Sequence, residues 1–220
     1  MMEIIIAVAW FCALGGLVNI LQYFFDITYQ KHWWLFTFIF LVIGVPGIII
    51  TTSLSSNILL FNTPGIFFGL IAALSYIAFE SWWGSRYKIT DMYRIDTVPK
   101  SYHQLLAPNV VSAVSKMSEI LIQDLVLLVI VTQLLQFDLS YLAAGCIFAV
   151  IVLLVHIPAP VLTGKIYGVI LMVAASVGAL FIPFVVSNLT LGFYIIFLFH
   201  LSFYVCILIW SRWMHIRTGQ

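Results

Sequence analysis

Charge is the scarcest property of this sequence. Charged residues make up 8% of the 220 residues and hydrophobic residues 64%, with a mean hydropathy of +1.16, whereas an ordinary soluble domain is roughly 25% charged. The net charge of +1 is dispersed, and no basic cluster alternates with aromatic residues, so nucleic acid is excluded as a partner. We therefore expect an integral, multi-pass membrane protein whose main partner is the lipid bilayer.

Cysteine is also scarce, and the sequence has no CxxC pair. Cys12, Cys146 and Cys206 each lie within an apolar run, so we expect small buried hydrophobes rather than a redox or zinc set. No internal repeat or low-complexity tract is evident, so an inverted-repeat transporter gains no support. The N-terminus lacks the basic region of a signal peptide and is expected to open the first membrane span.

Long apolar runs, in contrast, are abundant. A membrane helix needs about 20 mostly apolar residues, which predicts an all-α membrane bundle of about seven transmembrane helices. The predicted spans are 4–25, 33–50, 58–79, 109–135, 139–157, 161–185 and 189–210. We expect one integral membrane domain over 1–220: three N-terminal spans in 1–83, a cytoplasmic loop at 84–108, and four C-terminal spans in 109–220 that carry the candidate site.

Apart from Lys116 within the fourth predicted span, the Lys and Arg residues occur in the odd-numbered connections and at the C-terminal tail. They are Lys31, Arg86, Lys88, Arg94, Lys100, Lys165, Arg212 and Arg217. By the positive-inside rule, these connections and the C-terminus are cytoplasmic and the N-terminus lies outside. Paired or terminal tryptophans occur near the same span ends, which indicates an interfacial aromatic belt.

A polar stripe interrupts the fourth predicted span. Ser112, Lys116, Glu119 and Gln123 are separated by four, three and four residues, which places them on one helix face, with Asp124 beside it. Ionisable side chains are costly in a bilayer and usually face a protein interior or a water-filled cavity. The simplest alternative is a structural Lys116–Glu119 pair whose lysine snorkels to the cytoplasmic surface.

Two histidines lie in other C-terminal spans. His156 is at the end of the fifth predicted span and His200 is midway along the seventh. Together with Glu119, two imidazoles suffice to deprotonate a water, orient it and stabilise an oxyanion. The same trio is also a set of zinc ligands with one open position, so the cofactor is left open with zinc as one option.

The order and spacing of these residues resemble the CPBP family, the CAAX proteases and bacteriocin-processing enzymes also called Abi proteins. Members carry EExxxR, FxxxH and HxxxN on three helices. The corresponding stretches here are SEILIQ at 118–123, VLLVH at 152–156 and HLSFY at 200–204. The resemblance covers about half of the chain. Ser118 replaces the first glutamate, Gln123 the arginine, Val152 the phenylalanine and Tyr204 the asparagine.

The resemblance implies an intramembrane endopeptidase that acts near the cytoplasmic face on membrane or lipidated peptides. Glu119 and His156 would activate the attacking water, and His200 would stabilise the oxyanion. Ser118, Gln123 and Tyr204, at the other family positions, would then contact the substrate. Because Ser118 replaces a glutamate, a non-catalytic CPBP-like membrane partner or immunity protein is an alternative, and a small seven-span transporter is another.

Overall fold

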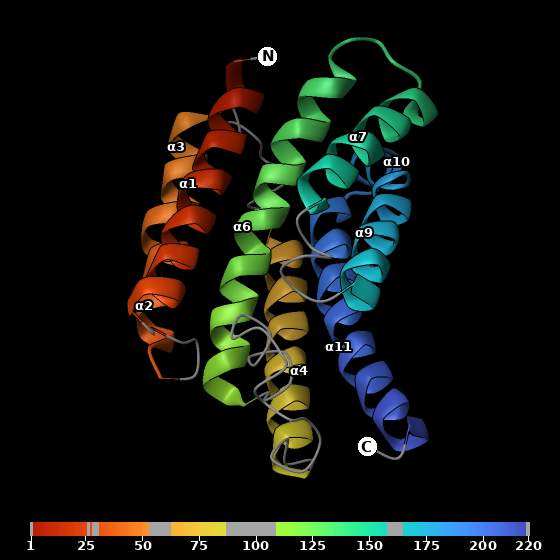
Figure 1. Ribbon diagram of the computed structural model, residues 1–220. Helices are drawn as coiled ribbons and strands as arrows, with labels where there is room; N and C mark the ends of the chain where they lie inside the picture. The colour runs from red at the N-terminus through yellow and green to blue at the C-terminus, as the bar shows by residue number, and fades with distance from the viewer. Residues whose placement is uncertain are drawn as a thin grey trace.

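The computed structural model describes residues 2–25, 27, 31–52, 63–86, 109–157 and 165–218. Within these ranges all regular secondary structure is helical, which confirms the all-α prediction (Figure 1). The helices are α1 (Met2–Phe25), α2 (Trp33–Thr37), the π-helix η1 (Phe38–Gly44), α3 (Val45–Thr51), α4 (Thr63–Arg86), α6 (Val110–Leu135), α7 (Tyr141–His156), α9 (Lys165–Ala179), α10 (Ile182–Asn188) and α11 (Gly192–Thr218).

Four helical segments of the described chain are long and apolar enough to cross a bilayer. They are Trp33–Thr51, which joins α2, η1 and α3, then Thr63–Arg86, Val110–Leu135 and Gly192–Trp210. Three shorter apolar helices, Met2–Val18, Tyr141–His156 and Met172–Asn188, accompany them. Large apolar side chains such as Phe67 and Phe199 are 66% and 73% exposed on the outside of the bundle. An apolar exterior of this extent is suited to lipid rather than water.

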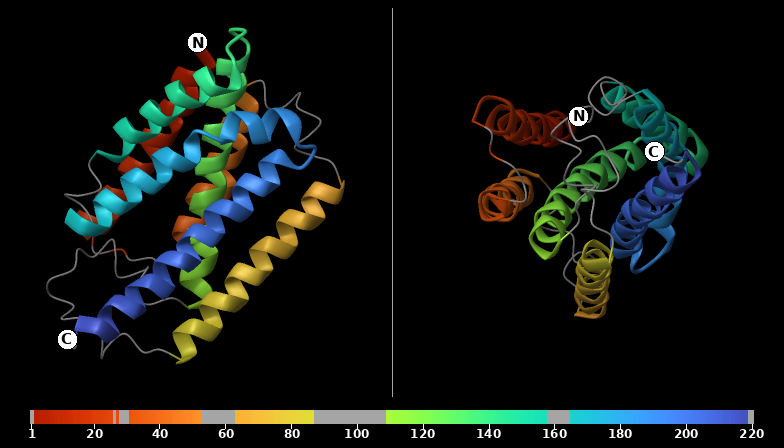
Figure 2. Two further views of the ribbon diagram at one scale, coloured as in Figure 1. Left: turned by 90° about the vertical axis from the view of Figure 1, so that its right-hand side faces the viewer. Right: turned by 60° about the horizontal axis from the view of Figure 1, so that its bottom comes forward.

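Helix α6 lies at the centre of the bundle. In Figure 2 it runs between the α1–α3 group on one side and α4 and α11 on the other, and it also contacts α7 and α10. In its most apolar stretch 67% of the residues are buried, against 28% in α4. The helix begins with a capping box, because the Asn109 side chain accepts from the Ser112 amide at 2.8 Å and Ser112 Oγ accepts from the Asn109 amide at 2.9 Å. Because α6 is surrounded by other helices, polar side chains along it lie inside the bundle.

Two apolar clusters fill the space on either side of α6. The larger cluster, which includes Phe36, Ile122 and Phe148, joins α1, the 33–51 segment, α6 and α7. The smaller one joins α4, α6 and α11 through Ala113, Leu201 and other side chains. The second interface also carries the polar side chains of the candidate site.

Two prolines lie where the helical hydrogen-bond pattern changes. Pro46 directly follows the π-helix η1 inside the helical segment 33–51, and Pro183 is in the first turn of α10. At Pro183 the missing amide costs no hydrogen bond, because an amide in a first turn has no intrahelical partner. The break at Leu180 and Phe181 divides the sixth predicted span into α9 and α10.

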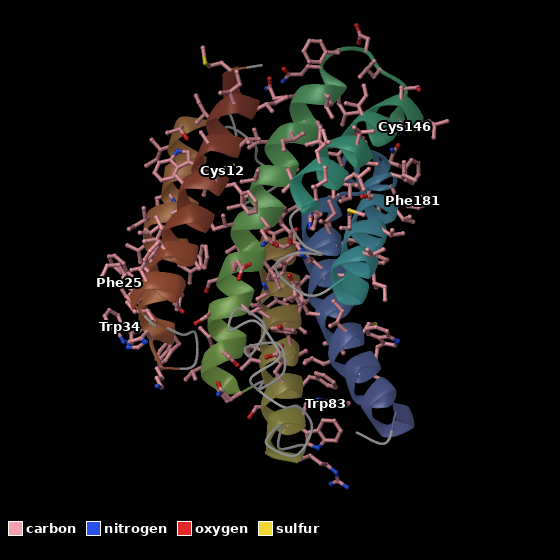
Figure 3. The ribbon with its side chains drawn as sticks, viewed as in Figure 1. Cys12, Phe25, Trp34, Trp83, Cys146 and Phe181 are labelled. Atoms are coloured by element: carbon pink, nitrogen blue, oxygen red, sulfur yellow. The ribbon has the colours of Figure 1, made fainter. Side chains whose placement is uncertain are left out.

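One prediction about the cysteines is wrong. Cys12, Cys146 and Cys206 are all exposed rather than buried, and Figure 3 labels the first two on α1 and α7. In a membrane protein the apolar exterior replaces the apolar core as a place for a small hydrophobic side chain. A run of apolar residues therefore does not identify which of its members face inward.

Several predicted features lie outside the described residues. They are the loop from 87 to 108 with Lys88, Arg94 and Lys100, the start of the third predicted span at 58–62, and the start of the sixth at 161–164. The third span is described from Thr63 and continues as helix to Arg86, beyond its predicted end at residue 79. This extension brings Glu80 into the helix.

Candidate functional site

The polar stripe of α6 forms a hydrogen-bonded chain. Lys116 Nζ lies 3.0 Å from Glu119 Oε1, and Gln123 Nε2 donates to the same oxygen at 3.0 Å. These bonds confirm that the three side chains share one face of the helix. They also confirm the Lys116–Glu119 pair of the simplest alternative, but the expectation that the lysine snorkels to the surface is wrong, because Lys116 is 7% exposed. Glu119 is thus engaged by a cation and an amide of its own helix.

Asp124, which the sequence placed beside the stripe, is directed at a different helix. Its Oδ1 lies 2.9 Å from Nδ1 of His200 on α11, and the carboxylate side chain has no exposed surface. The His200 side chain retains 23% of its surface exposed. The result is a buried carboxylate that holds a partly accessible imidazole across two helices.

Tyr204 connects the two pairs. Its ring stacks on His200 with the centroids 5.6 Å apart and the planes at 18°. Lys116 Nζ lies 4.5 Å from the centre of the same ring, within the range of a cation–π interaction. The tyrosine therefore links the Lys116–Glu119 pair with the Asp124–His200 pair. We call Tyr76, Glu80, Lys116, Glu119, Gln123, Asp124, His200 and Tyr204 the polar cluster.

Helix α4 supplies two members that the sequence analysis missed. Glu80 is 3% exposed and Tyr76 is 3% exposed, one turn apart on the same face. Glu80 interacts electrostatically with Lys116, and Tyr76 with Glu119 and Tyr204. The four-residue spacing of Tyr76 and Glu80 is a signal that was present in the sequence. The predicted third span ended at residue 79 and therefore excluded Glu80.

The expected trio of Glu119, His156 and His200 does not share hydrogen bonds. His156 Nδ1 lies 2.8 Å from the carbonyl oxygen of Val152 in its own helix, and α7 packs mainly on α9. Within the described ranges, no three His, Cys, Asp or Glu side chains are grouped so that they could hold a metal ion. Glu119 and His200 both belong to the polar cluster, but each has a different partner from the one expected.

The three expected substrate-contacting residues also differ in their positions. Gln123 and Tyr204 belong to the polar cluster, through Glu119 and through His200. Ser118 is fully buried, and its hydroxyl donates to the carbonyl of Val114 at 2.8 Å. A serine that returns its hydrogen bond to the preceding turn is satisfied by its own helix.

The Asp124–His200 pair has the chemistry of an oriented general base. An ionised carboxylate accepts from Nδ1–H, which fixes the tautomer and leaves Nε2 with its lone pair. Carboxylate–histidine pairs in hydrolases use this arrangement to hold the imidazole and to stabilise the imidazolium that forms. The buried Asp124 and the partly exposed His200 fit these two roles.

Composition and fold define the class to which this chain belongs: a helical membrane protein, with four helices in its described part that are able to span a bilayer. No family model, curated protein or solved structure matches the chain. Because a helical bundle by itself implies no activity, the function has to be inferred from the polar cluster.

Proposed function

We propose that this protein is a multi-pass intramembrane peptidase of the CPBP type, in which His200 is the general base and Asp124 holds it. The observation that carries the proposal is the 2.9 Å contact between His200 Nδ1 and the buried Asp124 Oδ1. The order of acidic and histidine residues on the C-terminal helices, from which the resemblance arose, supports the same chemistry. The proposal replaces Glu119 by Asp124 as the carboxylate partner of the histidine.

In this mechanism His200 Nε2 takes a proton from a water molecule, and the water oxygen attacks the peptide carbonyl carbon. The imidazolium, stabilised by Asp124, then returns the proton to the leaving amine as the C–N bond breaks. Lys116 is a fixed positive charge in the same cluster, and such a charge stabilises a developing oxyanion in a low-dielectric site. Glu119 balances Lys116 before the reaction.

We propose seven membrane crossings, with the N-terminus outside and the C-terminus in the cytoplasm. The termini lie at opposite ends of the bundle in Figure 1, as an odd number of crossings requires. Arg86 ends α4 and Lys165 begins α9, so both basic residues fall at the predicted cytoplasmic ends of their helices. A substrate would then reach the polar cluster from the cytoplasmic side.

A non-catalytic membrane partner or immunity protein is the second candidate. One observation favours it: Glu119, the family glutamate that remains, already bonds Lys116 and Gln123. A carboxylate held in this way is a structural counter-ion. The peptidase assay below separates the two candidates.

The test uses the purified full-length chain in lipid nanodiscs with two peptides, one farnesylated near its C-terminus and one with the same sequence but no lipid. Cleavage is followed by mass spectrometry. We expect the farnesylated peptide to be cut, and Asp124→Asn and His200→Ala to lower kcat by about 100- to 10,000-fold, the usual contribution of a general base. Ser202→Ala is the matched control, because Ser202 is an exposed neighbour on α11 outside the cluster.

Failure of the wild-type protein to cut either peptide would overturn the peptidase proposal in favour of the non-catalytic partner. Loss of activity in Glu119→Gln and His156→Ala, with Asp124→Asn fully active, would instead restore the trio expected from the sequence. Both outcomes require that each variant has the same elution volume and helical content as the wild-type protein.

A further inference from the structure

The polar cluster contains more acidic groups than basic ones. Glu80, Glu119 and Asp124 provide three carboxyl groups, whereas Lys116 and His200 provide at most two positive charges. Each basic group already has one close carboxylate partner, Glu119 for Lys116 and Asp124 for His200. Even with His200 protonated, one negative charge is left over if all three carboxyl groups are ionised.

Glu80 is the carboxyl group of the polar cluster that forms no ion pair, although the charge of Lys116 acts on it. Among the described residues, the ion pairs at the cluster join Lys116 to Glu119 and His200 to Asp124, and neither includes Glu80. The groups that act on Glu80 are Tyr76, one turn earlier on α4, and Lys116 on α6, while the rest of the polar cluster lies on α6 and α11. At 3% exposure, an unpaired charge at this position costs several kcal/mol.

Two orphaned polar atoms point to the same conclusion. Tyr76 Oη and Asp124 Oδ2 are buried without a hydrogen-bond partner. Glu80, one turn further along α4, is the carboxyl group within reach of the Tyr76 hydroxyl. Buried polar groups without partners are rare and indicate a missing proton donor, water or ion. The cluster thus has both the spare negative charge and the unused polar atoms of a binding site for a cation.

We propose that Glu80 binds a proton within the membrane-embedded cluster, so that the interface of α4, α6 and α11 is a proton-binding site. A proton on Glu80 removes the surplus charge and gives the buried carboxyl group an O–H donor for a nearby oxygen such as Tyr76 Oη. An alkali cation fits less well, because hard cations take six or more oxygen ligands and the described cluster offers few unused ones. This inference is independent of peptide hydrolysis.

The experiment is infrared spectroscopy of the full-length protein in nanodiscs at neutral pH, in H₂O and D₂O. A protonated carboxyl group in an apolar site gives a carbonyl stretching band that is absent from carboxylates. We expect this band in the wild-type protein, a shift when glutamate carries a ¹³C-labelled side-chain carboxyl, and no shift when aspartate carries the label. The labels identify the residue type without a substitution, so the result does not depend on any variant folding.

Glu80→Gln is expected to abolish the band, because glutamine has the shape of protonated glutamate but no acid proton. Ser202→Ala is the matched control and is expected to retain the band, because Ser202 is an exposed residue of α11 and its substitution leaves the charges of the cluster unchanged. Three results would overturn the proposal. They are the absence of any acid band in the wild-type protein, a band that shifts with labelled aspartate, and a band that appears only after sodium and potassium are removed.

Discussion

At the scale of single residues, the buried charged side chains of the polar cluster are each compensated by specific neighbours, and Lys116 is the clearest case. Lys116 is 7% exposed, yet its ammonium contacts Glu119 Oε1 at 3.0 Å and lies over the Tyr204 ring at 4.5 Å. A buried ammonium with a carboxylate and an aromatic face as neighbours is compensated on two sides. The lysine is therefore an internal counter-ion rather than a surface residue.

Lys116→Met tests this role. Removing the ammonium leaves the carboxylates of the cluster without their main positive charge, so we expect a loss of about 3 kcal/mol in the free energy of unfolding. The measurement is denaturant titration of the reconstituted protein. The double variant Lys116→Met with Glu119→Gln removes the stranded charge and is expected to recover most of the loss. If Lys116→Met alone were as stable as the wild-type protein, Lys116 would not be an internal counter-ion.

At the scale of helices, close packing depends on small residues at the crossings. Gly145 in α7 faces the carbonyl oxygen of Leu180 at the break between α9 and α10, and a Cβ at this position would collide with that backbone atom. The atoms nearest to a Cβ at Gly44 in η1 belong to the side chains of Ile122 and Leu14. Side-chain ends move aside more easily than backbone, so the two glycines differ in how much they constrain the fold.

Gly145→Ala is accordingly expected to destabilise the protein by about 1–3 kcal/mol, the usual cost of overpacking. Thermal unfolding in detergent, monitored by helical circular dichroism, gives the comparison. Gly16→Ala in the middle of α1 is the control: nothing lies within 4 Å of the added Cβ, so a neutral effect or a gain of about 0.5–1 kcal/mol is expected. Equal effects of the two substitutions would contradict the role of the Leu180 carbonyl.

At the scale of the whole molecule, one long helix supports two halves of different character. On one side of α6 the contacts are mainly apolar, with Ser115 donating to the carbonyl of Trp33 at 3.0 Å. On the other side, α4 and α11 enclose the polar cluster. Near the opposite end of α6, Gln133 donates to Glu3 of α1 at 3.2 Å. The tryptophans labelled in Figure 3, Trp34 and Trp83, lie towards the end of the bundle that carries the C-terminus.

The proposed topology is tested with single cysteines in a variant whose native cysteines are replaced by alanine. Met2→Cys and Gln136→Cys are expected to react with a membrane-impermeant thiol reagent added outside intact cells, and Lys31→Cys only after permeabilisation. All three residues are exposed. Reaction of Met2→Cys on the same side as Lys31→Cys would mean that α1 does not cross the membrane and would contradict seven crossings.

Much of the fold was predictable because the length of an apolar run acts locally. The run from Val110 to Leu135 is helical, as expected from the predicted span 109–135, and Asn109 caps it. The one-turn Lys116–Glu119 pair was predictable for the same reason, since three-residue spacing on a helix fixes the contact. Glu80 was not predicted because the third span was expected to end at residue 79. The helix continues to Arg86, since the Glu80 side chain is buried inside the bundle.

The sequence by itself determined that this is a helical membrane protein, and it determined which polar residues share a face of α6. Those properties depend on composition and on 3.6-residue periodicity, which act within one segment of the chain. Only the tertiary structure decided that Asp124 meets His200, that Glu80 joins them from α4, and that His156 bonds its own helix. Partners on different helices depend on how the helices rotate and cross, and no local pattern fixes those angles.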